Sequence, residues 1–312
     1  MVSHPSPQLY SSGHHLDTSA ECFGVLCSSI EIKDDRHALH ARIKRDGYLY
    51  LPGFWSREEV LKRRIMITDQ LAKKGFLNLD YPIIDAVAKE NIDLTSVSTH
   101  FKNKDRQDSM FLEMSRLLFS GKIINFLESY LGGEVQAYEY TWFRVRNRGM
   151  GTKPHCDIVF FNRGTHNIYS AWVPYGDIDQ EVGGLMILED SHNKRHRLKN
   201  YLKRDSDTYC KNRKGTEQYA SQETKVWSGT LTKNPVTLRE KLGGRWLRAN
   251  YRMGDLLLFS PYTVHCSLDN NTDRLRISTD TRYQLASDPY DERWIGPNPV
   301  GHGADGKRGV IC

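Results

Sequence analysis

The sequence of 312 residues lacks the features that mark several specialised classes of protein. It contains no apolar run long enough to cross a membrane, no stretch that resembles a signal peptide, and no CxxC pair. Its six cysteines show no paired framework: Cys22, Cys27, Cys156, Cys210, Cys266 and Cys312. We therefore expect an intracellular, reduced and soluble protein without a membrane partner, for which the cytoplasm is the default location.

The composition is that of an ordinary globular protein, with 26% charged and 38% hydrophobic residues. The net charge of +6 permits an anionic partner but does not require one. Residues 1–30 contain Ser, His, Pro and Gly with little periodicity, so we expect a flexible N-terminal extension there. Residues 31–312 are expected to form a single domain, and nothing in the sequence indicates its oligomeric state.

Hydrophobic periodicity predicts helices in the first part of the chain and strands in the second. The expected helices cover residues 35–46, 57–74, 81–90 and 107–130, and a strand covers residues 48–51. Ser56 and Glu59 form a capping box at the start of the second helix, because each can satisfy an exposed amide of the other. Strands dominate from residue 134, which predicts a β core over residues 134–285. The fold class is therefore α+β, with a mainly β core flanked by N-terminal helices.

A His-x-Asp pair, His155 and Asp157, lies near the middle of the chain. On an extended strand alternate side chains share a face, so these two would point the same way and Cys156 the opposite way. A third donor, His265, ends an apolar, strand-like run. Two imidazoles and one carboxylate on one face leave open positions on an octahedral ion, as in non-haem Fe(II) oxygenases. We predict that His155, Asp157 and His265 bind iron.

A structural zinc site is the competing metal hypothesis, because Cys156 and Cys266 stand beside two of the proposed ligands. Strand alternation argues against zinc, since the cysteines and the histidines would then lie on opposite faces. We interpret both cysteines as small buried hydrophobic residues.

Arg276 stands eleven positions after His265. An oxygenase that activates O2 with a dicarboxylate co-substrate must hold that co-substrate beside the metal. A planar guanidinium can do this through two parallel charge-assisted hydrogen bonds. We therefore predict that Arg276 is the carboxylate anchor.

Five motifs together resemble the phytanoyl-CoA dioxygenase family. They are His155-x-Asp157, the run from Gly183-Gly184 to Ser191-His192, Gly254-Asp255, His265-x-Ser267 and Arg276. The resemblance spans about residues 46–283 and implies a double-stranded β-helix, the jelly roll of cupin-like proteins. It implies Fe(II) at His155, Asp157 and His265. It also implies the distal carboxylate of 2-oxoglutarate at Arg276, with Ser267 assisting.

The same resemblance implies an Fe(II)- and 2-oxoglutarate-dependent dioxygenase. Such an enzyme uses O2 to hydroxylate an unactivated C–H bond and releases succinate and CO2, and ascorbate is expected to support turnover. Desaturation or ring formation would need the same residues. The protein contributes fixed ligands, a preorganised anchor and a dry pocket.

Tyr140, Arg144 and Arg146 recur at period two within residues 135–146 and would share one face of a regular strand. This face is either a wall that meets the carboxylate of a substrate or co-substrate, or an outer sheet face with solvated arginines. Trp172 would lie on the next strand and border the 2-oxoglutarate. The loops at residues 147–153 and 161–166 are the expected rim of the pocket.

Residues 191–252 form a basic insert with sixteen Lys or Arg and five Asp or Glu, a net charge of +11 that exceeds the whole chain's +6. Three interpretations remain open: a lid over the iron that holds a small anionic substrate, a surface for single-stranded nucleic acid, or a solvated loop. The absence of any known nucleic-acid motif makes the second unattractive.

Two alternatives to a small-molecule hydroxylase follow. A cupin-like protein could have kept its metal without catalysis, although the intact Arg276 argues against this. A protein that binds or oxidises nucleic acid through the basic insert would show steeply salt-dependent binding. Which substrate is used, whether an acyl-CoA, an amino acid or a natural-product intermediate, cannot be read from the sequence.

Overall fold

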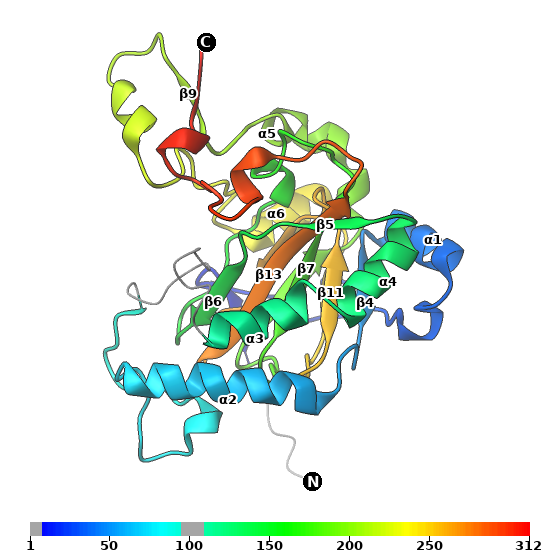
Figure 1. Cartoon of the computed structure of the whole chain (residues 1–312), viewed down its shortest axis with the longest axis vertical. Coiled ribbons are helices and arrows are strands. Elements are labelled where there is room, and N and C mark those ends of the chain that lie inside the picture. The colour runs from blue at the N-terminus through cyan, green and yellow to red at the C-terminus, as the bar shows by residue number, and fades with distance from the viewer. Residues whose placement is uncertain (1–7, 95–108) are drawn as a thin grey trace.

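The computed structural model describes residues 8–94 and 109–312 (Figure 1). Helix α1 (Arg36–Asp46) begins after Asp35, whose carboxylate accepts a hydrogen bond from the amide of Ala38. It ends at Gly47, which has the left-handed φ of 79° that glycine tolerates. Strand β4 (Tyr48–Leu51) follows. These elements confirm the predicted helix and strand.

Helix α2 (Arg57–Lys73) begins with the predicted capping box, because the Ser56 hydroxyl accepts from the Glu59 amide and the Glu59 carboxylate accepts from the Ser56 amide. The helix predicted at residues 81–90 is wrong. Only a short 3-10 turn, Ile83–Asp85, forms there, and the chain then turns through Ala86 at a φ of 53°.

The helix predicted at residues 107–130 consists of two helices, α3 (Ser109–Leu118) and α4 (Lys122–Leu131). Gly121 separates them with a φ of 63°, which an α-helix cannot contain. Residues 107–108 of the prediction lie outside the described residues. The two helices lie with α2 on one face of the larger sheet (Figure 1).

The β core consists of two sheets. The larger sheet contains, in order, β4, β11 (Leu256–Phe259), β7 (Ile168–Pro174), β13 (Arg276–Leu285) and β5 (Val135–Ala137), while β6 (Trp142–Arg146) also pairs with β13. The smaller sheet contains β12 (His265–Ser267), β8 (Leu185–Leu188), β10 (Trp246–Arg248) and β3 (Phe23–Val25).

Side-chain alternation along the strands separates two apolar layers. Leu256 and Leu258 of β11 pack toward the helices, whereas Leu257 and Phe259 face the interior between the sheets. There they meet residues of the smaller sheet such as Ile187. Two facing sheets with helices on one outer face form the double-stranded β-helix that the sequence predicted.

Strand β13 carries the polar part of this interior. Its residues Ile277 and Tyr283 join the apolar layer beneath the helices. Arg276, Asp280 and Arg282 alternate with them and therefore point the other way, between the sheets. The interior is thus apolar over β4 and β11 and charged over β13.

Residues 8–30 do not form the flexible extension that their composition suggested. Strands β1 (Tyr10–Ser11) and β2 (His14–His15) pair with each other, and β3 pairs in parallel with β10 of the smaller sheet. Asp269 fixes the turn between β1 and β2 by accepting hydrogen bonds from the amides of Ser12 and Gly13. Such long-range contacts leave no periodic signal in the sequence. Residues 1–7 of that prediction lie outside the described residues.

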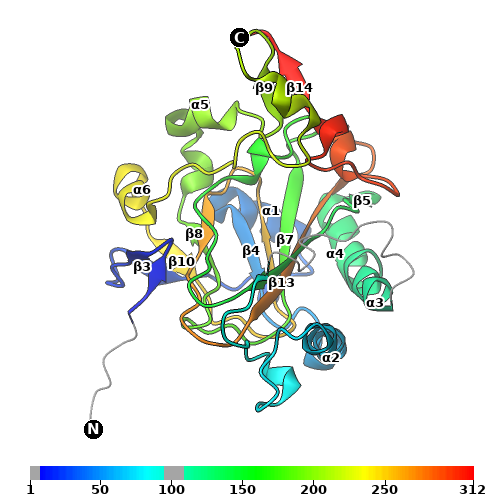
Figure 2. The same cartoon turned by 90° about the vertical axis from the view of Figure 1, so that its left-hand side faces the viewer.

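The basic insert contains the short helices α5 (Lys199–Leu202) and α6 (Pro235–Leu242) outside the smaller sheet (Figure 2), and its last part supplies strand β10 of that sheet. Its strand β9 (Thr208–Cys210) pairs in parallel with β14 (Arg308–Val310) near the C-terminus. Cys210 and Cys312 form a disulfide, so the expectation of unpaired cysteines is wrong for these two. They are 102 positions apart, and only the pairing of β9 with β14 brings them together. No helix among the described residues is long and apolar enough to span a membrane.

Candidate metal centre

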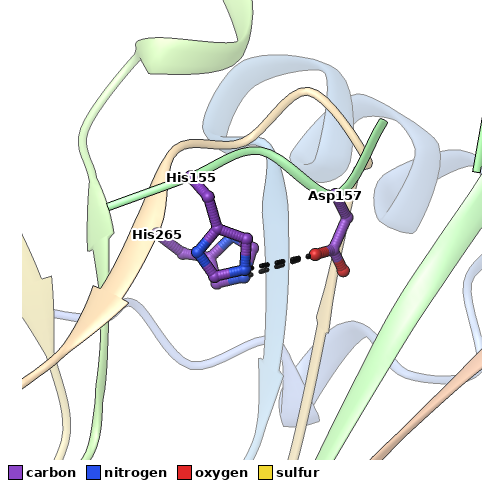
Figure 3. Close-up of side chains that lie close together, drawn as sticks. All are labelled: His155, Asp157 and His265. Carbon is purple, nitrogen blue, oxygen red and sulfur yellow. Dashed lines mark ion pairs between the residues drawn. The ribbon is translucent and has the colours of Figure 1, made fainter. Parts of the chain in front are cut away.

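His155, Asp157 and His265 lie together in the interior of the β core, as predicted (Figure 3). One ligand atom from each residue lies within 4.8 Å of the other two. The Oδ1 atom of Asp157 is 3.5 Å from Nε2 of His155 and 3.6 Å from Nε2 of His265. This cluster is the only group of three such donors found among the described residues.

The backbone that presents the ligands is not the single strand that the sequence predicted. His155 forms an isolated antiparallel bridge with His265, in which each amide donates to the other's carbonyl at 3.0 Å. Cys156 is extended, but Asp157 already begins a 3-10 turn, Asp157–Val159. The extended Cys156 still separates the two ligands, so both reach the same side.

The orientation of both imidazoles is fixed by backbone carbonyls. Nδ1 of His155 lies 2.8 Å from the carbonyl oxygen of Lys153, and Nδ1 of His265 lies 3.1 Å from that of Thr263. A carbonyl can only accept, so each Nδ1 carries the proton and each Nε2 keeps its lone pair. Burial, and then the neighbouring His155, lower the pKa of His265 to about 3. The His265 ring is therefore neutral and can donate its Nε2 lone pair to a cation.

The second oxygen of Asp157 is held by the protein. Its Oδ2 accepts hydrogen bonds from the Ser170 hydroxyl on β7 and from Nη2 of Arg282 on β13, the latter at 2.6 Å. Burial alone would raise the pKa of the Asp157 carboxyl, but Arg282 and the two histidines outweigh it and hold the pKa well below its usual range. Asp157 is thus a carboxylate with Oδ1 turned toward the histidines.

Arg282 belongs to a buried network of charges. It donates to Asp280 at 2.8 Å, and Asp280 also accepts two hydrogen bonds from Arg144 on β6. The rings of Trp142 and Phe161 lie 4.4 and 4.6 Å from the Arg282 guanidinium. Outer contacts of this kind orient the ligands of metal centres and tune their affinity.

The three donors fit a divalent iron ion. Two neutral imidazole nitrogens and one carboxylate oxygen are the ligand set of the facial triad, and their lone pairs converge on one side. Cys156 and Cys266 pack instead in the apolar cluster outside the smaller sheet. The zinc hypothesis that invoked these cysteines is therefore unsupported.

Arg276 is buried, with 1% of its surface exposed, and has no carboxylate partner among the described residues. Its Nη1 donates to the carbonyl of Gly183, and its Nε has no hydrogen-bond partner in the described part of the chain. Arg146 stands directly opposite on β6, and its Nε is likewise unsatisfied there. Two unneutralised guanidinium groups side by side form a site for an anion.

The pKa values of these arginines express the same imbalance of charge. Burial, and then the charges of Arg146 and Arg144, lower the pKa of Arg276 to about 9. Burial, and then Arg144, lower that of Arg146 to about 10. An anion bound between Arg146 and Arg276 would stabilise both charged guanidinium groups and raise these pKa values.

Ser267 and Trp172 are buried near these groups. The Ser267 hydroxyl accepts a hydrogen bond from the amide of Thr152 at 2.7 Å and can still donate one. Trp172 packs against Tyr251 in the apolar part of the interior, with ring centres 4.7 Å apart. In the register of the sheet it lies opposite Asp280, but it is not part of the pocket described below.

A pocket of about 250 Å³ opens onto the metal centre. We call its β-core side the inner wall, which consists of Trp142, Arg144, Arg146, His155, Asp157 and Arg282. We call the opposite side the outer wall, which consists of Lys225, Ser228, Thr230 and His302. The predicted rim is present in Gly151, Thr152, Lys153 and Phe161, and Phe160 lies between the walls.

Tyr140 does not reach this pocket. It is buried behind Trp142, with their ring centres 4.6 Å apart, and also packs against Trp294. Strand β6 begins only at Trp142, so the period-two pattern that grouped Tyr140 with Arg144 and Arg146 does not extend to it. Arg144 and Arg146 do line the pocket, and the alternative of solvated arginines on an outer face is wrong.

The insert is joined directly to the segment that carries the metal ligands. The Tyr201 hydroxyl accepts a hydrogen bond from the amide of Cys156 and donates to the carbonyl of Gly229. The amide of Leu231 donates to the carbonyl of Pro154. A Cβ atom on Gly229 would lie only 2.0 Å from the Phe160 ring. This part of the insert therefore packs on the metal segment and is not a solvated loop.

The C-terminal segment completes the outer wall through Asp207. This buried carboxylate accepts hydrogen bonds from Arg293, His302 and Lys307 at 2.7–2.9 Å. Burial alone would raise the pKa of the Asp207 carboxyl, but the hydrogen bonds from His302 and Lys307 and the charge of Arg293 outweigh it and lower the pKa to about 2. A carboxylate can only accept here, so Nδ1 of His302 is the donor and Nε2 is the remaining acceptor.

Sequence reasoning missed several residues of the site. Arg282 had a signal, because it stands six positions after Arg276, an even spacing that puts both side chains on one face of a strand. Lys225 and His302 had none, since their place in the pocket depends on pairing between distant segments.

Known proteins are similar to this chain in sequence and in fold. The family model described as "Phytanoyl-CoA dioxygenase (PhyH)" matches residues 43–278, more than half of the chain. A curated relative, 1-deoxypentalenic acid 11-beta-hydroxylase of Streptomyces exfoliatus, is 24% identical over 294 residues, which cover 89% of this chain and 91% of the relative.

Solved structures share the fold. The chain is similar to EctD from S. alaskensis with 2-oxoglutarate and 5-hydroxyectoine, at 16% identity and a TM-score of 0.56 over 95% of this chain and 96% of that one. It is also similar to the epimerase SnoN in complex with Fe3+, alpha ketoglutarate and nogalamycin RO. That match has 20% identity and a TM-score of 0.53 over 85% of this chain and 87% of that one.

Proposed function

Because the chain belongs to the phytanoyl-CoA dioxygenase family and is an iron- and 2-oxoglutarate-dependent oxygenase, we propose that it hydroxylates an unactivated C–H bond of a small anionic molecule. Succinate and CO2 would be released. The observation that carries the proposal is the convergence of His155, Asp157 and His265 beside a buried, unneutralised pair of arginines.

We assign the iron to Nε2 of His155, Nε2 of His265 and Oδ1 of Asp157. When bound, iron supplies the oxidising chemistry together with 2-oxoglutarate and O2. The chain's own task is to hold these donors. The carbonyls of Lys153 and Thr263 fix the two rings, while Arg282 and Ser170 keep the carboxylate ionised and oriented.

We assign the distal carboxylate of 2-oxoglutarate to Arg276, with Arg146 beside it and Ser267 as a further donor. A carboxylate there would satisfy the orphan Nε atoms of both arginines and neutralise their charge. Trp172 is proposed to border this region from the apolar part of the interior. Arg144, held by Asp280, would face the substrate.

The substrate is proposed to be small, because the pocket of about 250 Å³ accepts only a compact group beside the metal. It is proposed to be anionic, because Lys and Arg dominate the charged groups of the pocket. We propose the cytoplasm as its location, where the Cys210–Cys312 disulfide would be open to reduction.

The proposal is tested by succinate formation. Protein purified without oxygen and loaded with Fe(II) would be given 2-oxoglutarate, ascorbate and O2. We expect slow succinate formation even before a substrate is found, and its loss in His155→Ala. The matched control is His37→Ala, which removes an exposed histidine from α1 and should keep the wild-type rate. Wild-type protein that forms no more succinate than His155→Ala, and does not bind 2-oxoglutarate, would refute the proposal.

A further inference from the structure

The charges around the pocket do not balance. Five Lys or Arg side chains line it, Arg144, Arg146, Lys153, Lys225 and Arg282, against one carboxylate, Asp157. Arg282 is neutralised by Asp157 and Asp280, and Arg144 by Asp280. Arg146 lies beside Arg276 at the buried end, where the proposed function places the 2-oxoglutarate carboxylate. Two lysines, Lys153 and Lys225, are left over.

Neither lysine is neutralised by the protein. Among the described residues the side chain of Lys153 forms no ion pair or hydrogen bond, and that of Lys225 forms neither but lies over the ring of Phe160, whose centre is 4.7 Å from its Nζ. Both residues are exposed to solvent at the pocket. A lysine on a pocket wall without a carboxylate partner is available to an anionic ligand.

The ring of Phe160 contacts both Lys225 and the proposed metal ligand His155. The centre of the Phe160 ring lies 5.8 Å from that of His155 and 6.1 Å from that of His302. Lys225 lies over the same ring, so its ammonium group is close to the metal ligands but on the outer wall. A group bound there would belong to a molecule whose other end can reach the metal.

The backbone on either side of Lys225 is fixed. The amide of Trp227 donates to the carbonyl of Ser206, and the amide of Ser206 donates to the carbonyl of Val159 in the metal segment. The carbonyl of Thr224 accepts from Lys307, whose ammonium group also binds the buried Asp207. Lys225 is therefore presented from a supported segment, although it lies in the basic insert.

We propose that Lys225, assisted by Lys153, forms an oxyanion subsite for the substrate. This subsite is separate from the arginine pair at the buried end. Its ligand is a carboxylate, phosphate or sulfate group on the molecule to be oxidised. The inference rests on the proposed function for the identity of that molecule, but the subsite itself can be measured without it.

Sulfate is a suitable probe, because its charge does not change near neutral pH. Calorimetry would measure sulfate binding to the Fe(II) protein saturated with 2-oxoglutarate, without oxygen. We expect one site in the wild type and an affinity reduced about fivefold or more in Lys225→Met. Lys225→Arg should keep most of the affinity. Lys214→Met, which removes another exposed lysine of the insert, should bind sulfate as the wild type does.

The same titration is also made without 2-oxoglutarate. Three results would overturn the subsite: no sulfate binding to the wild type under either condition, equal affinity in Lys225→Met, or binding without 2-oxoglutarate that disappears when 2-oxoglutarate saturates the protein. The last would place sulfate at Arg276. A separate measurement tests the proposed function. If the wild-type protein binds Fe(II) but gives no visible absorption band with 2-oxoglutarate, the proposed function fails. Sulfate would then still be titrated on the Fe(II) protein alone, and the same comparison of variants would decide.

Discussion

The inner and outer walls of the pocket differ in what holds their charges. On the inner wall the side chains of Asp157 and Arg282 are only 1% and 4% exposed and pair with each other. On the outer wall Lys225 is exposed and has no carboxylate partner among the described residues. A buried, paired group is fixed in one geometry, whereas an exposed and unpaired one can exchange water for a ligand.

The family match over residues 43–278 includes the three proposed iron ligands and Arg276. It also includes Lys225, Ser228 and Thr230 of the outer wall. One residue of each wall lies beyond the match, Arg282 on the inner wall and His302 on the outer wall.

Asp157→Ala should have the largest effect. It removes one of three ligand atoms from the inner wall and leaves Arg282 with only Asp280 as a carboxylate partner. We expect succinate formation to fall more than about 100-fold, beyond the effect of losing an outer contact of a ligand. The measurement is initial rate at saturating 2-oxoglutarate. A rate within tenfold of wild type would argue that Asp157 is not a ligand.

Asp207→Asn should have the next largest effect and should act on the outer wall. The asparagine keeps the shape but leaves Lys307 without a carboxylate and weakens the hold on Arg293 and His302. We expect a loss of roughly 3 kcal/mol in the free energy of unfolding, measured in urea. Asp273→Asn, which alters an exposed pair with Arg148, is the control and should change it little.

Arg282→Gln should weaken iron binding about 10- to 100-fold, because Asp157 loses the partner that orients and ionises it. Equilibrium dialysis with Fe(II) in the absence of oxygen measures this. Arg148→Gln removes an exposed arginine and is the matched control. If both variants bind iron as tightly as wild type, the inner wall does not depend on its buried network.

The smallest effect is expected from pH acting on Lys225. Desolvation by the surrounding protein atoms, and then the charge of Arg144, lower the pKa of Lys225 to about 8. The charges of Asp207, Asp157 and Asp280 act in the opposite direction but are weaker. The ammonium form needed for an anion is therefore lost as pH rises through about 8. Sulfate affinity should fall about tenfold between about pH 7 and about pH 9. A flat profile would show that Lys225 is not the contact.

The metal centre was predictable, because its residues follow patterns that are local in the sequence. His155, Asp157 and His265 were found from their spacing, and the structure brings them together. The predicted strand was wrong, because Asp157 begins a 3-10 turn. The two side chains still lie on one side, because one extended residue, Cys156, separates them.

The outer wall was not predictable, because it depends on contacts between distant segments. The pairing of β9 with β14 and the bonds of Asp207 to Arg293, His302 and Lys307 join the insert to the C-terminus. Composition revealed that the insert is basic but not which of its lysines lines the pocket. The same limit explains the error over residues 8–30, whose strand β3 is held by β10 of the smaller sheet.

The most direct measurement is a titration of the Fe(II) protein with 2-oxoglutarate in the absence of oxygen, followed by the visible charge-transfer band of the complex. The metal centre and the Arg276 site as assigned predict a saturable band in wild type and none in His155→Ala. In Arg276→Gln the affinity for 2-oxoglutarate should fall roughly 100-fold, because a buried carboxylate would lose its charged partner. A wild-type protein that binds Fe(II) yet shows no band, or an Arg276→Gln variant with unchanged affinity, would contradict the site assigned here.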